Sequence, residues 1–345
     1  MFHPPPLVAV TMGDPAGIGP EVIAMVVRQT NISPEWRILV VGDETAMVRA
    51  FEILGGADPL VRVNGFESKN LLGAGPYFFA TTKLPENEIR FAQPSAGSAT
   101  ATIDFIRRAA VAAWDGKVDA ICTAPINKHA LKQAGFAFPG HTEFLQHLTG
   151  ARRAVMMLAG SSLRVSLVTV HCALAEVPRF LDIELITETI SITYQSLVDD
   201  FDISRPRLAV AGLNPHAGDA GLFGGEEQRF IGPAVSHCQQ QGMDVSGPLS
   251  PDTVFYRAHQ GEYDAVVSMY HDQGLIPFKL LHFQDGVNLT LGLPIIRTSV
   301  DHGTAYDLAG TGKANPTSLL AALDLAAGIA RRKKRRAQRA QCTKH

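Results

Sequence analysis

The sequence predicts an α/β protein built around a largely parallel sheet. Short apolar runs rich in β-branched residues alternate with amphipathic segments of helix length, the pattern of strands and their covering helices. The 345 residues predict one large or two medium-sized domains, and a hydrophobic content of 46% suffices for a substantial core. Three histidines follow strand-like runs directly, and open α/β sheets bind ligands just outside the carboxyl ends of their strands.

The expected elements follow from the spacing of apolar residues along the chain. In the first half, strands are expected at 7–12, 37–41 and 118–122, with helices from Pro20, after Gly42-Asp43 and at 98–113. The stretch 51–93 is irregular and predicts no element. In the second half, strands are expected at 155–159, 164–170, 207–212 and 265–269, with helices at 183–197, 226–241 and 318–330.

Composition predicts a cytoplasmic protein. No run of 18 apolar residues exists, so no membrane span is expected, and Met1–Leu7 lacks the basic and apolar regions of a secretory signal. The cysteines have no paired spacing, which suits a reducing compartment and argues against a thiolate metal site; they are Cys122, Cys172, Cys238 and Cys342.

The formal net charge of −2 is unevenly distributed. Residues 331–345 carry eight Lys or Arg and no acidic residue, which leaves the body of the chain near −10. An acidic body makes nucleic acid an unlikely main partner. The basic tail is most simply a solvated, partly frayed extension, with contact to RNA or anionic lipid as the alternative.

Three histidines are the strongest candidates for a shared site. His171, His216 and His271 each follow a buried, strand-like run, so their side chains would be delivered to one edge of a sheet. Three imidazoles there can hold a divalent cation and leave a coordination position for substrate. Asp272 can orient one of them, or it can cap a helix. The alternative is three unrelated, merely hydrogen-bonded histidines.

Three polar residues downstream of His271 lie in apolar surroundings and indicate an anionic substrate. They are Lys279, Asn288 and Arg297. Lys and Arg are rarely buried without a partner, and the arginine fork matches phosphate or carboxylate. An internal salt bridge is the competing interpretation for each cation.

Several turns carry weaker signals. The segment Met12–Glu21 can receive an anion at a helix start, but its spacing is not that of a Rossmann dinucleotide fingerprint. Asn127-Lys128 and His141-Thr142 can bind an anion, or Asn127 and Thr142 can simply cap helices. Residues 300–316 form a Gly-rich loop.

Taken together, these segments resemble the 4-hydroxythreonine-4-phosphate dehydrogenase family of pyridoxal phosphate biosynthesis. The matching stretches are Gly13–Glu21, Ala124–Lys128, Gly140–Phe144, the three histidine segments, Gly286–Gly292 and Arg297–Gly312. The resemblance implies two α/β/α domains with a cleft between them, similar to isocitrate and isopropylmalate dehydrogenases and unlike a Rossmann dinucleotide fold. The implied boundaries are 1–127 plus 296–332 for a first domain on the cofactor side, 128–295 for a second domain with the metal and substrate ligands and dimer contacts, and 333–345 for the tail.

The resemblance also implies roles for individual residues. His171, His216 and His271 match the metal ligands, and together with Lys279 they form the implied catalytic set. The implied substrate contacts are His141, Thr142, Lys279, Asn288 and Arg297. The implied contacts to the cofactor are His302, Gly303, Thr304 and Asn315. The implied cofactors are NAD or NADP and one divalent metal per subunit, which is Zn, Mg or Co, in a homodimer whose active site lies near the subunit interface.

The implied reaction is oxidation of the 3-hydroxyl of 4-phosphohydroxy-L-threonine, followed by decarboxylation to 3-amino-2-oxopropyl phosphate. The sequence does not separate this small anionic phosphorylated substrate from 4-phosphothreonate or 4-phosphoerythronate, on which relatives in the same family act. From a different class, a zinc hydrolase with three histidines is the alternative, because such a site also suits water activation.

Overall fold

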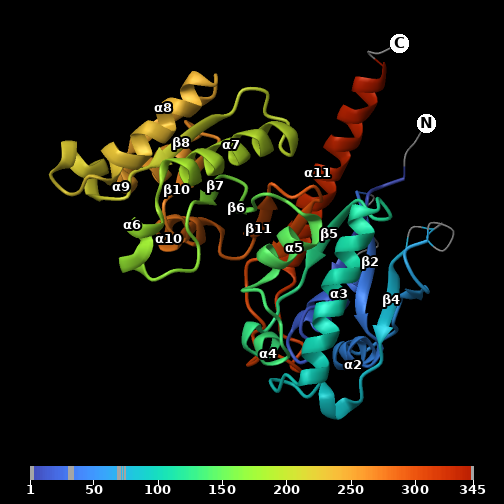
Figure 1. Ribbon diagram of the computed structural model, residues 1–345. Coiled ribbons are helices and arrows are strands. Elements are labelled where there is room, and N and C mark those ends of the chain that lie inside the picture. Colours follow the sequence, from blue (N-terminus) through green and yellow to red (C-terminus); the bar gives the residue numbers. More distant parts are fainter. Residues whose placement is uncertain (1–3, 30–34, 68–70, 72, 74, 343–345) are drawn as a thin grey trace. The chain divides into compact units, whose positions relative to one another are not determined.

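The computed structural model describes residues 4–29, 35–67, 71, 73 and 75–342 (Figure 1). The chain forms two compact units: unit 1 is Met1–Arg152 with Leu293–His345, and unit 2 is Arg153–Gly292. Each unit contains strands covered by helices, so the predicted α/β class is confirmed. None of the helices in the described ranges is both long and apolar enough to cross a membrane.

The strands of unit 1 form a parallel array in the order β3-β4-β2-β1-β5-β12. Their bounds are β1 (Leu7–Thr11), β2 (Arg37–Asp43), β3 (Val61–Arg62), β4 (Tyr77–Thr82), β5 (Ala120–Thr123) and β12 (Arg297–Val300). All five residues of β1 are buried, as expected for a strand covered on both faces. β12 returns from the far end of the chain to pair with β5, where Thr298 lies opposite Cys122.

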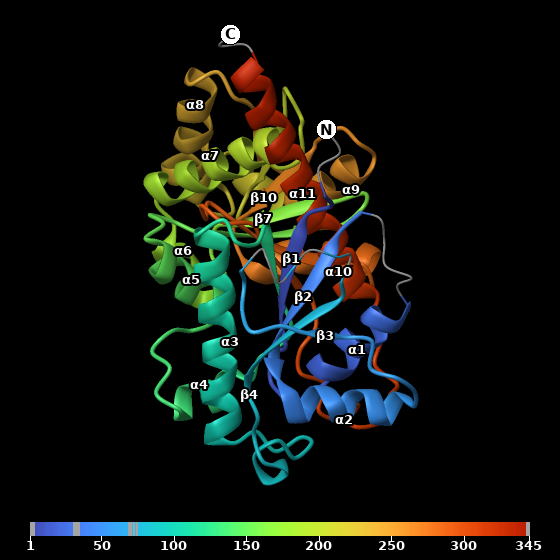
Figure 2. The same ribbon diagram turned by 90° about the vertical axis from the view of Figure 1, so that its right-hand side faces the viewer.

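Helices cover both faces of this array (Figures 1 and 2). Their bounds are α1 (Gly19–Gln29), α2 (Glu44–Leu54), α3 (Ala96–Trp114), α4 (Lys128–Gln133), α5 (His141–Thr149) and α11 (Thr317–Cys342). α3 lies on one face, and α1 and α11 lie on the other. α3 begins before the expected Ser98, because Ser95 and Ser98 form a capping box at its start.

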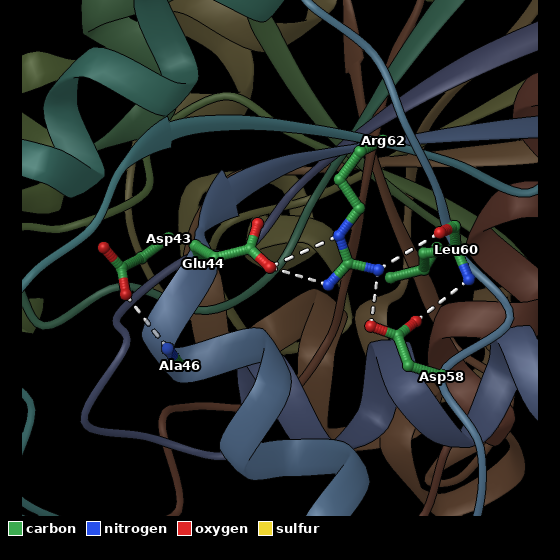
Figure 3. A network of polar contacts seen from close by, with 6 residues as sticks. All are labelled: Asp43, Glu44, Ala46, Asp58, Leu60 and Arg62. Atoms are coloured by element: carbon green, nitrogen blue, oxygen red, sulfur yellow. Dashed lines mark hydrogen bonds and ion pairs between the residues drawn. The ribbon is translucent and has the colours of Figure 1, made fainter.

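Polar contacts order the segment that predicted no element (Figure 3). Arg62 forms ion pairs with Glu44 at 2.7 Å and with Asp58 at 2.5 Å. The buried Asp43 caps α2 by accepting from the Ala46 amide at 2.9 Å, and its second oxygen accepts from the Leu84 amide at 2.7 Å. The segment contains β3 and β4, where the sequence predicted no element: β3 has only two residues, both exposed, and only the first two residues of β4 are fully buried, so neither strand has a regular apolar repeat.

The strands of unit 2 lie in the order β11-β6-β7-β10-β8-β9. Their bounds are β6 (Val155–Ala159), β7 (Arg164–Leu167), β8 (Arg207–Ala211), β9 (Asp244–Leu249), β10 (Ala265–Ser268) and β11 (Val287–Leu291). The pairs β11/β6 and β6/β7 are antiparallel, and the pairs β7/β10, β10/β8 and β8/β9 are parallel. The predicted mixture of parallel and antiparallel strands is therefore confirmed.

The helices of unit 2 are α6 (Val177–Phe180), α7 (Ile183–Asp199), α8 (Gly232–Gln240), α9 (Pro251–His259) and α10 (His271–His282). Val254 and Phe255 of α9 and Leu275 and Phe278 of α10 join strand residues in one buried cluster. The expected helix at 226–241 is α-helical only from Gly232. A single π-helical turn, Glu227–Ile231, precedes it, because Pro233 has no N–H to donate to the preceding turn.

Two features of unit 1 differ from expectation. α11 continues through the basic run to Cys342 instead of fraying near 331, since its Ala, Arg, Lys and Gln residues all favour a helix. Lys334 pairs with Asp119 at 2.6 Å, and Arg331 pairs with Glu35.

The boundaries between the units also differ from expectation. The units divide at Arg152 and Leu293, whereas the expected boundaries are 127/128 and 295/296. Residues 128–152 belong to unit 1, because Ala130 and Leu131 of α4 pack with Ala99 of α3.

Candidate active site

The three predicted metal ligands all follow strands of unit 2. His171 follows β7, His216 follows β8, and His271 begins α10 directly after β10. β10 lies between β7 and β8 and pairs with both in parallel, so the three carboxyl ends meet at the same edge. The sheet therefore delivers the three histidines to one edge, as the sequence predicts.

His171 and His271 are the two that lie together. Their ring centroids are 5.9 Å apart and the rings are tilted by 36°. Nδ1 of His271 lies 2.7 Å from Oδ1 of Asp272, which fixes the ring and leaves Nε2 for a ligand. Asp272 is thus the orienting neighbour that its position suggested.

His216 lies in a strained turn. Five consecutive residues have positive φ angles: His216 (53°), Ala217 (53°), Gly218 (82°), Asp219 (43°) and Ala220 (57°). Left-handed backbone costs roughly 1–2 kcal/mol for each residue with a Cβ, and such strain is concentrated at functional sites.

A buried carboxylate braces this turn. Glu227 is 4% exposed, and its Oε1 accepts hydrogen bonds from the backbone N–H groups of Leu213 and Asn214, both at 2.8 Å. Its Oε2 accepts from Nδ2 of Asn214 at 3.0 Å. These bonds hold the segment that leads from β8 into the strained turn and so fix where His216 stands.

Imidazole nitrogens are suitable ligands for a divalent metal. Of the three histidines, however, the structure brings only His171 and His271 close together within one chain. Across the residues that the structure describes, no three His, Cys, Asp or Glu side chains form a metal-binding group. His216 instead lies near Asp252: the pKa of that carboxyl is lowered first by its hydrogen bond with Ser250 and also by the imidazole. Asp252 is a neighbour of the site that the sequence did not single out.

Unit 2 also carries two of the predicted substrate contacts. Lys279 is half-buried on α10, on the same helix as His271. Asn288 lies on β11 opposite Leu158, and its Oδ1 is buried with no hydrogen-bond partner among the described residues. An amide oxygen in that state is suited to receive a donor from a ligand.

Arg297 is a buried cation in unit 1. It is the first residue of β12, it is 3% exposed, and Nη2 donates to Oγ1 of Thr123 at 2.8 Å. Burial lowers its pKa to about 10, against the opposing influence of Cys122 and Glu143. A desolvated guanidinium gains strongly from an anion at bonding distance.

His141 and Thr142 begin α5, close to Arg297. Gly140 is the N-cap, and within the described chain no side chain caps this helix, so Thr142 does not have the alternative capping role. Burial holds the pKa of His141 well below its usual value, and the charges of Arg297 and Lys128 lower it further. Its Nε2 is buried without a hydrogen-bond partner among the described residues. The imidazole is therefore held in its neutral form, near enough to two cations to be influenced by their charges.

Lys128 completes this group. It is the first residue of α4, directly after Asn127, whose Oδ1 accepts from the Ala130 amide at 2.8 Å. A Cβ on Gly140 would lie 4.0 Å from Nζ of Lys128, so the ammonium stands beside the start of α5. Asn127 is thus a helix cap, and Lys128 is a candidate ligand. We name Lys128, His141, Thr142 and Arg297 the anion cluster.

The predicted cofactor contacts lie in the loop between β12 and α11, also in unit 1. His302 bonds through Nδ1 to the Gly303 carbonyl at 3.0 Å, and its Nε2 is buried without a partner in the described chain. A side chain on Gly303 would meet open space. These two residues fit a bound group, whereas Oδ1 of Asn315 accepts from the Thr317 amide at 2.9 Å and so serves the start of α11.

Buried acids hold this loop in place. The carboxylate of Glu21, 1% exposed, accepts from the amides of Gly310 at 2.6 Å and Gly312 at 2.7 Å. Tyr306 donates to Oδ2 of Asp14 at 2.5 Å. Asp14 and Tyr306 lie in segments that the sequence singles out, but their pairing could not be predicted because they lie at opposite ends of the chain.

Comparison with known proteins identifies the family of the chain. Residues 35–326 match the family described as "Pyridoxal phosphate biosynthetic protein PdxA". The chain is 53% identical over 329 residues to a 4-hydroxythreonine-4-phosphate dehydrogenase of Geobacter metallireducens, covering 94% of this chain and 96% of that protein. It is 44% identical over 329 residues to a D-threonate 4-phosphate dehydrogenase of Cupriavidus necator, covering 95% and 98%.

A solved structure gives the same result. The 1.25 Å crystal structure of 4-hydroxythreonine-4-phosphate dehydrogenase from Klebsiella pneumoniae superposes with a TM-score of 0.84 at 42% identity, over 94% of this chain and 98% of that one. A dehydrogenase family implies a nicotinamide cofactor and a divalent metal. By sequence and by fold, this chain is an oxidoreductase that belongs to the PdxA family of pyridoxal phosphate biosynthetic proteins.

Proposed function

We propose that this chain oxidises the 3-hydroxyl of 4-phosphohydroxy-L-threonine with NAD and decarboxylates the product to 3-amino-2-oxopropyl phosphate, a step of pyridoxal phosphate biosynthesis. The observation that carries the proposal of a phosphorylated, anionic substrate is the anion cluster, in which a neutral imidazole is influenced by the charges of two cations. The name of the Geobacter metallireducens relative supports the same substrate.

The anion cluster is suited to a phosphate dianion. Arg297 supplies a buried, planar fork, Lys128 an ammonium, and His141 and Thr142 lie where the free amides of α5 also point outward. A phosphate here would offset the desolvation of Arg297 and would bond the partnerless Nε2 of His141. The phosphoryl end of the substrate would thereby be fixed, which orients the carbon to be oxidised.

The residues of unit 2 have proposed roles that follow from their own chemistry. When bound, a divalent metal lowers the pKa of the substrate hydroxyl, and NAD accepts the hydride. Asp272 orients His271 through Nδ1, Asn288 offers its partnerless Oδ1 to a donor of the substrate, and Lys279 offers a cation to its carboxylate. The alcohol carbon loses a hydride, its oxygen loses a proton, and the resulting β-keto acid loses CO2 and takes up a proton at carbon.

A second candidate substrate is D-threonate 4-phosphate, the compound that appears in the name of the Cupriavidus necator relative. It shares the phosphate, the 3-hydroxyl and the carboxylate, so the anion cluster serves both compounds equally. The two differ only at the second carbon, which carries an amino group in one and a hydroxyl in the other.

The test is a panel of substrates incubated with NAD and, separately, with Zn, Mg or Co. NADH formation with 4-phosphohydroxythreonine at a kcat/KM at least tenfold above that with 4-phosphothreonate or 4-phosphoerythronate supports the proposal. The reverse ranking assigns the chain to sugar-acid catabolism. Release of product without any NADH would instead indicate the three-histidine hydrolase.

We also propose that the chain forms a homodimer through α9 and α10 of unit 2. Large apolar side chains are exposed there, including Leu280 at 85%, Ile276 at 67% and Tyr256 at 68%, around a cavity of about 570 Å³. A contiguous apolar surface of this kind marks an interface, and a symmetric dimer covers it on both copies. Light scattering of the parent protein should give twice the mass of one chain. The Leu280→Glu variant should give a mass closer to that of a single chain. A parent protein with the mass of a single chain would refute the dimer.

A further inference from the structure

The hydroxyl of Tyr306 lies at the centre of a polar network in unit 1. It donates to Oδ2 of Asp14 at 2.5 Å and accepts from Nδ2 of Asn127 at 2.8 Å. Tyr306 itself belongs to the loop between β12 and α11, two residues after Thr304. One oxygen atom therefore connects three segments that are distant in sequence.

Each partner of Tyr306 is itself fixed. Asp14 is 3% exposed, its Oδ1 accepts from the Ala16 amide at 2.9 Å, and its own amide donates to the Pro125 carbonyl at 2.9 Å. Asn127 caps α4 through its Oδ1. Because neither partner is free to move, the Tyr306 hydroxyl has a defined position.

The loop around Tyr306 needs such an anchor. Ala305 has a φ of 41°, a conformation that costs free energy for a residue with a Cβ. The Thr304 carbonyl accepts from the Ile18 amide at 3.1 Å, and a Cβ on Gly17 would lie 3.0 Å from that carbonyl oxygen. The loop is thus pressed against the turn that contains Asp14, and Tyr306 holds it there.

We propose that Tyr306 is a positioning residue for the cofactor: through Asp14 and Asn127 it sets the conformation in which His302, Gly303 and Thr304 receive NAD. This inference rests on the proposed function, since it assigns these three residues to the cofactor. Tyr306 does not act on the substrate or on the reacting atoms. Its hydroxyl is the second hydrogen-bond donor to the buried carboxylate of Asp14, after the Ala16 amide. Without this hydroxyl, Asp14 keeps only the bond from the Ala16 amide, and Nδ2 of Asn127 loses its acceptor.

The test compares Tyr306→Phe with the parent enzyme in direct NADH binding, in steady-state kinetics and in hydrogen exchange of the ligand-free protein. We expect the Kd for NADH to rise at least fivefold and backbone exchange over 301–312 to accelerate. The KM for the phosphorylated substrate should stay within twofold, because Oδ1 of Asn127 still caps α4 next to Lys128.

The matched control is Tyr263→Phe in unit 2, which removes a hydroxyl that accepts from Nη2 of Arg257 at 2.8 Å. It should leave NADH binding and exchange over 301–312 unchanged. Asp14→Asn gives a second, independent variant: if Tyr306 acts through Asp14, the double variant should bind NADH no more weakly than Tyr306→Phe alone.

Two results would overturn the inference. One is a Tyr306→Phe protein whose NADH affinity is within twofold of the parent and whose exchange over 301–312 is unchanged. The other is a double variant whose loss equals the product of the single losses, which would show that the two residues act independently. If the parent enzyme reduces no NAD with any substrate of the panel, the proposed function fails, whereas exchange over 301–312 still decides whether Tyr306 anchors the loop.

Discussion

Nη2 of Arg297 donates a hydrogen bond to Oγ1 of Thr123 across two parallel strands, at 2.8 Å, although the two residues are 174 positions apart. The bond fixes one arm of the guanidinium fork on β5 and defines its orientation within the anion cluster. The geometry of the fork, and not only its charge, is therefore expected to determine how the substrate binds.

Arg297→Lys tests that expectation. Lysine keeps the charge but loses the fork and the bond to Thr123, so we predict a KM for the phosphorylated substrate at least tenfold higher, which is about 1.4 kcal/mol. The Kd for NADH should change less than twofold. Arg207→Lys is the control, since Arg207 is the exposed first residue of β8 and pairs with Asp264. An unaltered substrate KM in the Arg297→Lys enzyme would show that Arg297 has a purely structural role.

The metal assignment is tested by counting bound ions. His171→Ala, His216→Ala and His271→Ala should each lose most of the divalent metal and nearly all turnover, because each removes one of three expected ligands. His237→Ala on α8, whose ring contacts Gln241 at 2.9 Å, should retain both. Full metal content in the His216→Ala protein would remove that residue from the site.

Ala220→Gly should stabilise the protein. Ala220 has a φ of 57°, which glycine adopts without a steric penalty, so the free energy of unfolding in urea should rise by about 1 kcal/mol. Ala321→Gly, inside α11, should lower it by about the same amount, since helix interiors favour alanine. A destabilised Ala220→Gly protein would mean that the strained turn depends on the Ala220 methyl group.

The lowered pKa of His141 predicts a pH-dependent contribution to stability. The unfolded chain protonates this imidazole below its ordinary value of 6.5, whereas the folded protein resists protonation because of burial and the nearby cations. Its contribution is therefore complete above pH 6.5 and is lost as the pH falls toward the lowered pKa, by at most about 1.4 kcal/mol per pH unit. His141→Gln should flatten the fall of unfolding free energy between pH 7.5 and pH 5.5, as measured in urea, and the exposed His129→Gln should leave it as steep as before.

The basic end of α11 is predicted to be dispensable for catalysis. A chain that ends at Arg331 loses the ion pair of Lys334 with Asp119, an exposed contact worth at most about 1 kcal/mol. We expect it to fold and to produce NADH at the parent rate, with weaker, salt-sensitive binding to polyanions. A tenfold loss of NADH production would show that this segment supports the active site.

The sequence predicts best where burial is regular. The strands before His171, His216 and His271 are buried along most of their length, so their runs are rich in apolar residues and the expected ranges agree with the observed strands within a few residues. α10 had no such pattern. It contains Gly274 and Pro277 and exposes Ile276 and Leu280, and Gly274 is required because a Cβ there would lie 2.6 Å from Val165.

Local pattern identifies candidate residues but not their encounters. The sequence offers Arg297 and His141 separately as candidate anion ligands, yet only the pairing of β12 with β5 brings Arg297 toward α5. Nothing in the sequence indicates that the exposed Lys128 extends its ammonium to Gly140 at the start of α5. Tyr306 and Asp14 are 292 positions apart, and no periodicity connects them.

The return of β12 to β5 sets an order for the assembly of the chain. Unit 2 is one continuous stretch, Arg153–Gly292, and can complete its sheet as soon as that stretch has left the ribosome. Unit 1 cannot, because its last strand and α11 are synthesised after all of unit 2. Arg297, one of the two cations of the anion cluster, and the whole cofactor loop belong to that final segment. A nascent chain therefore lacks a working site until β12, the cofactor loop and the first part of α11 have docked. The appearance of substrate binding is thus a late event in folding.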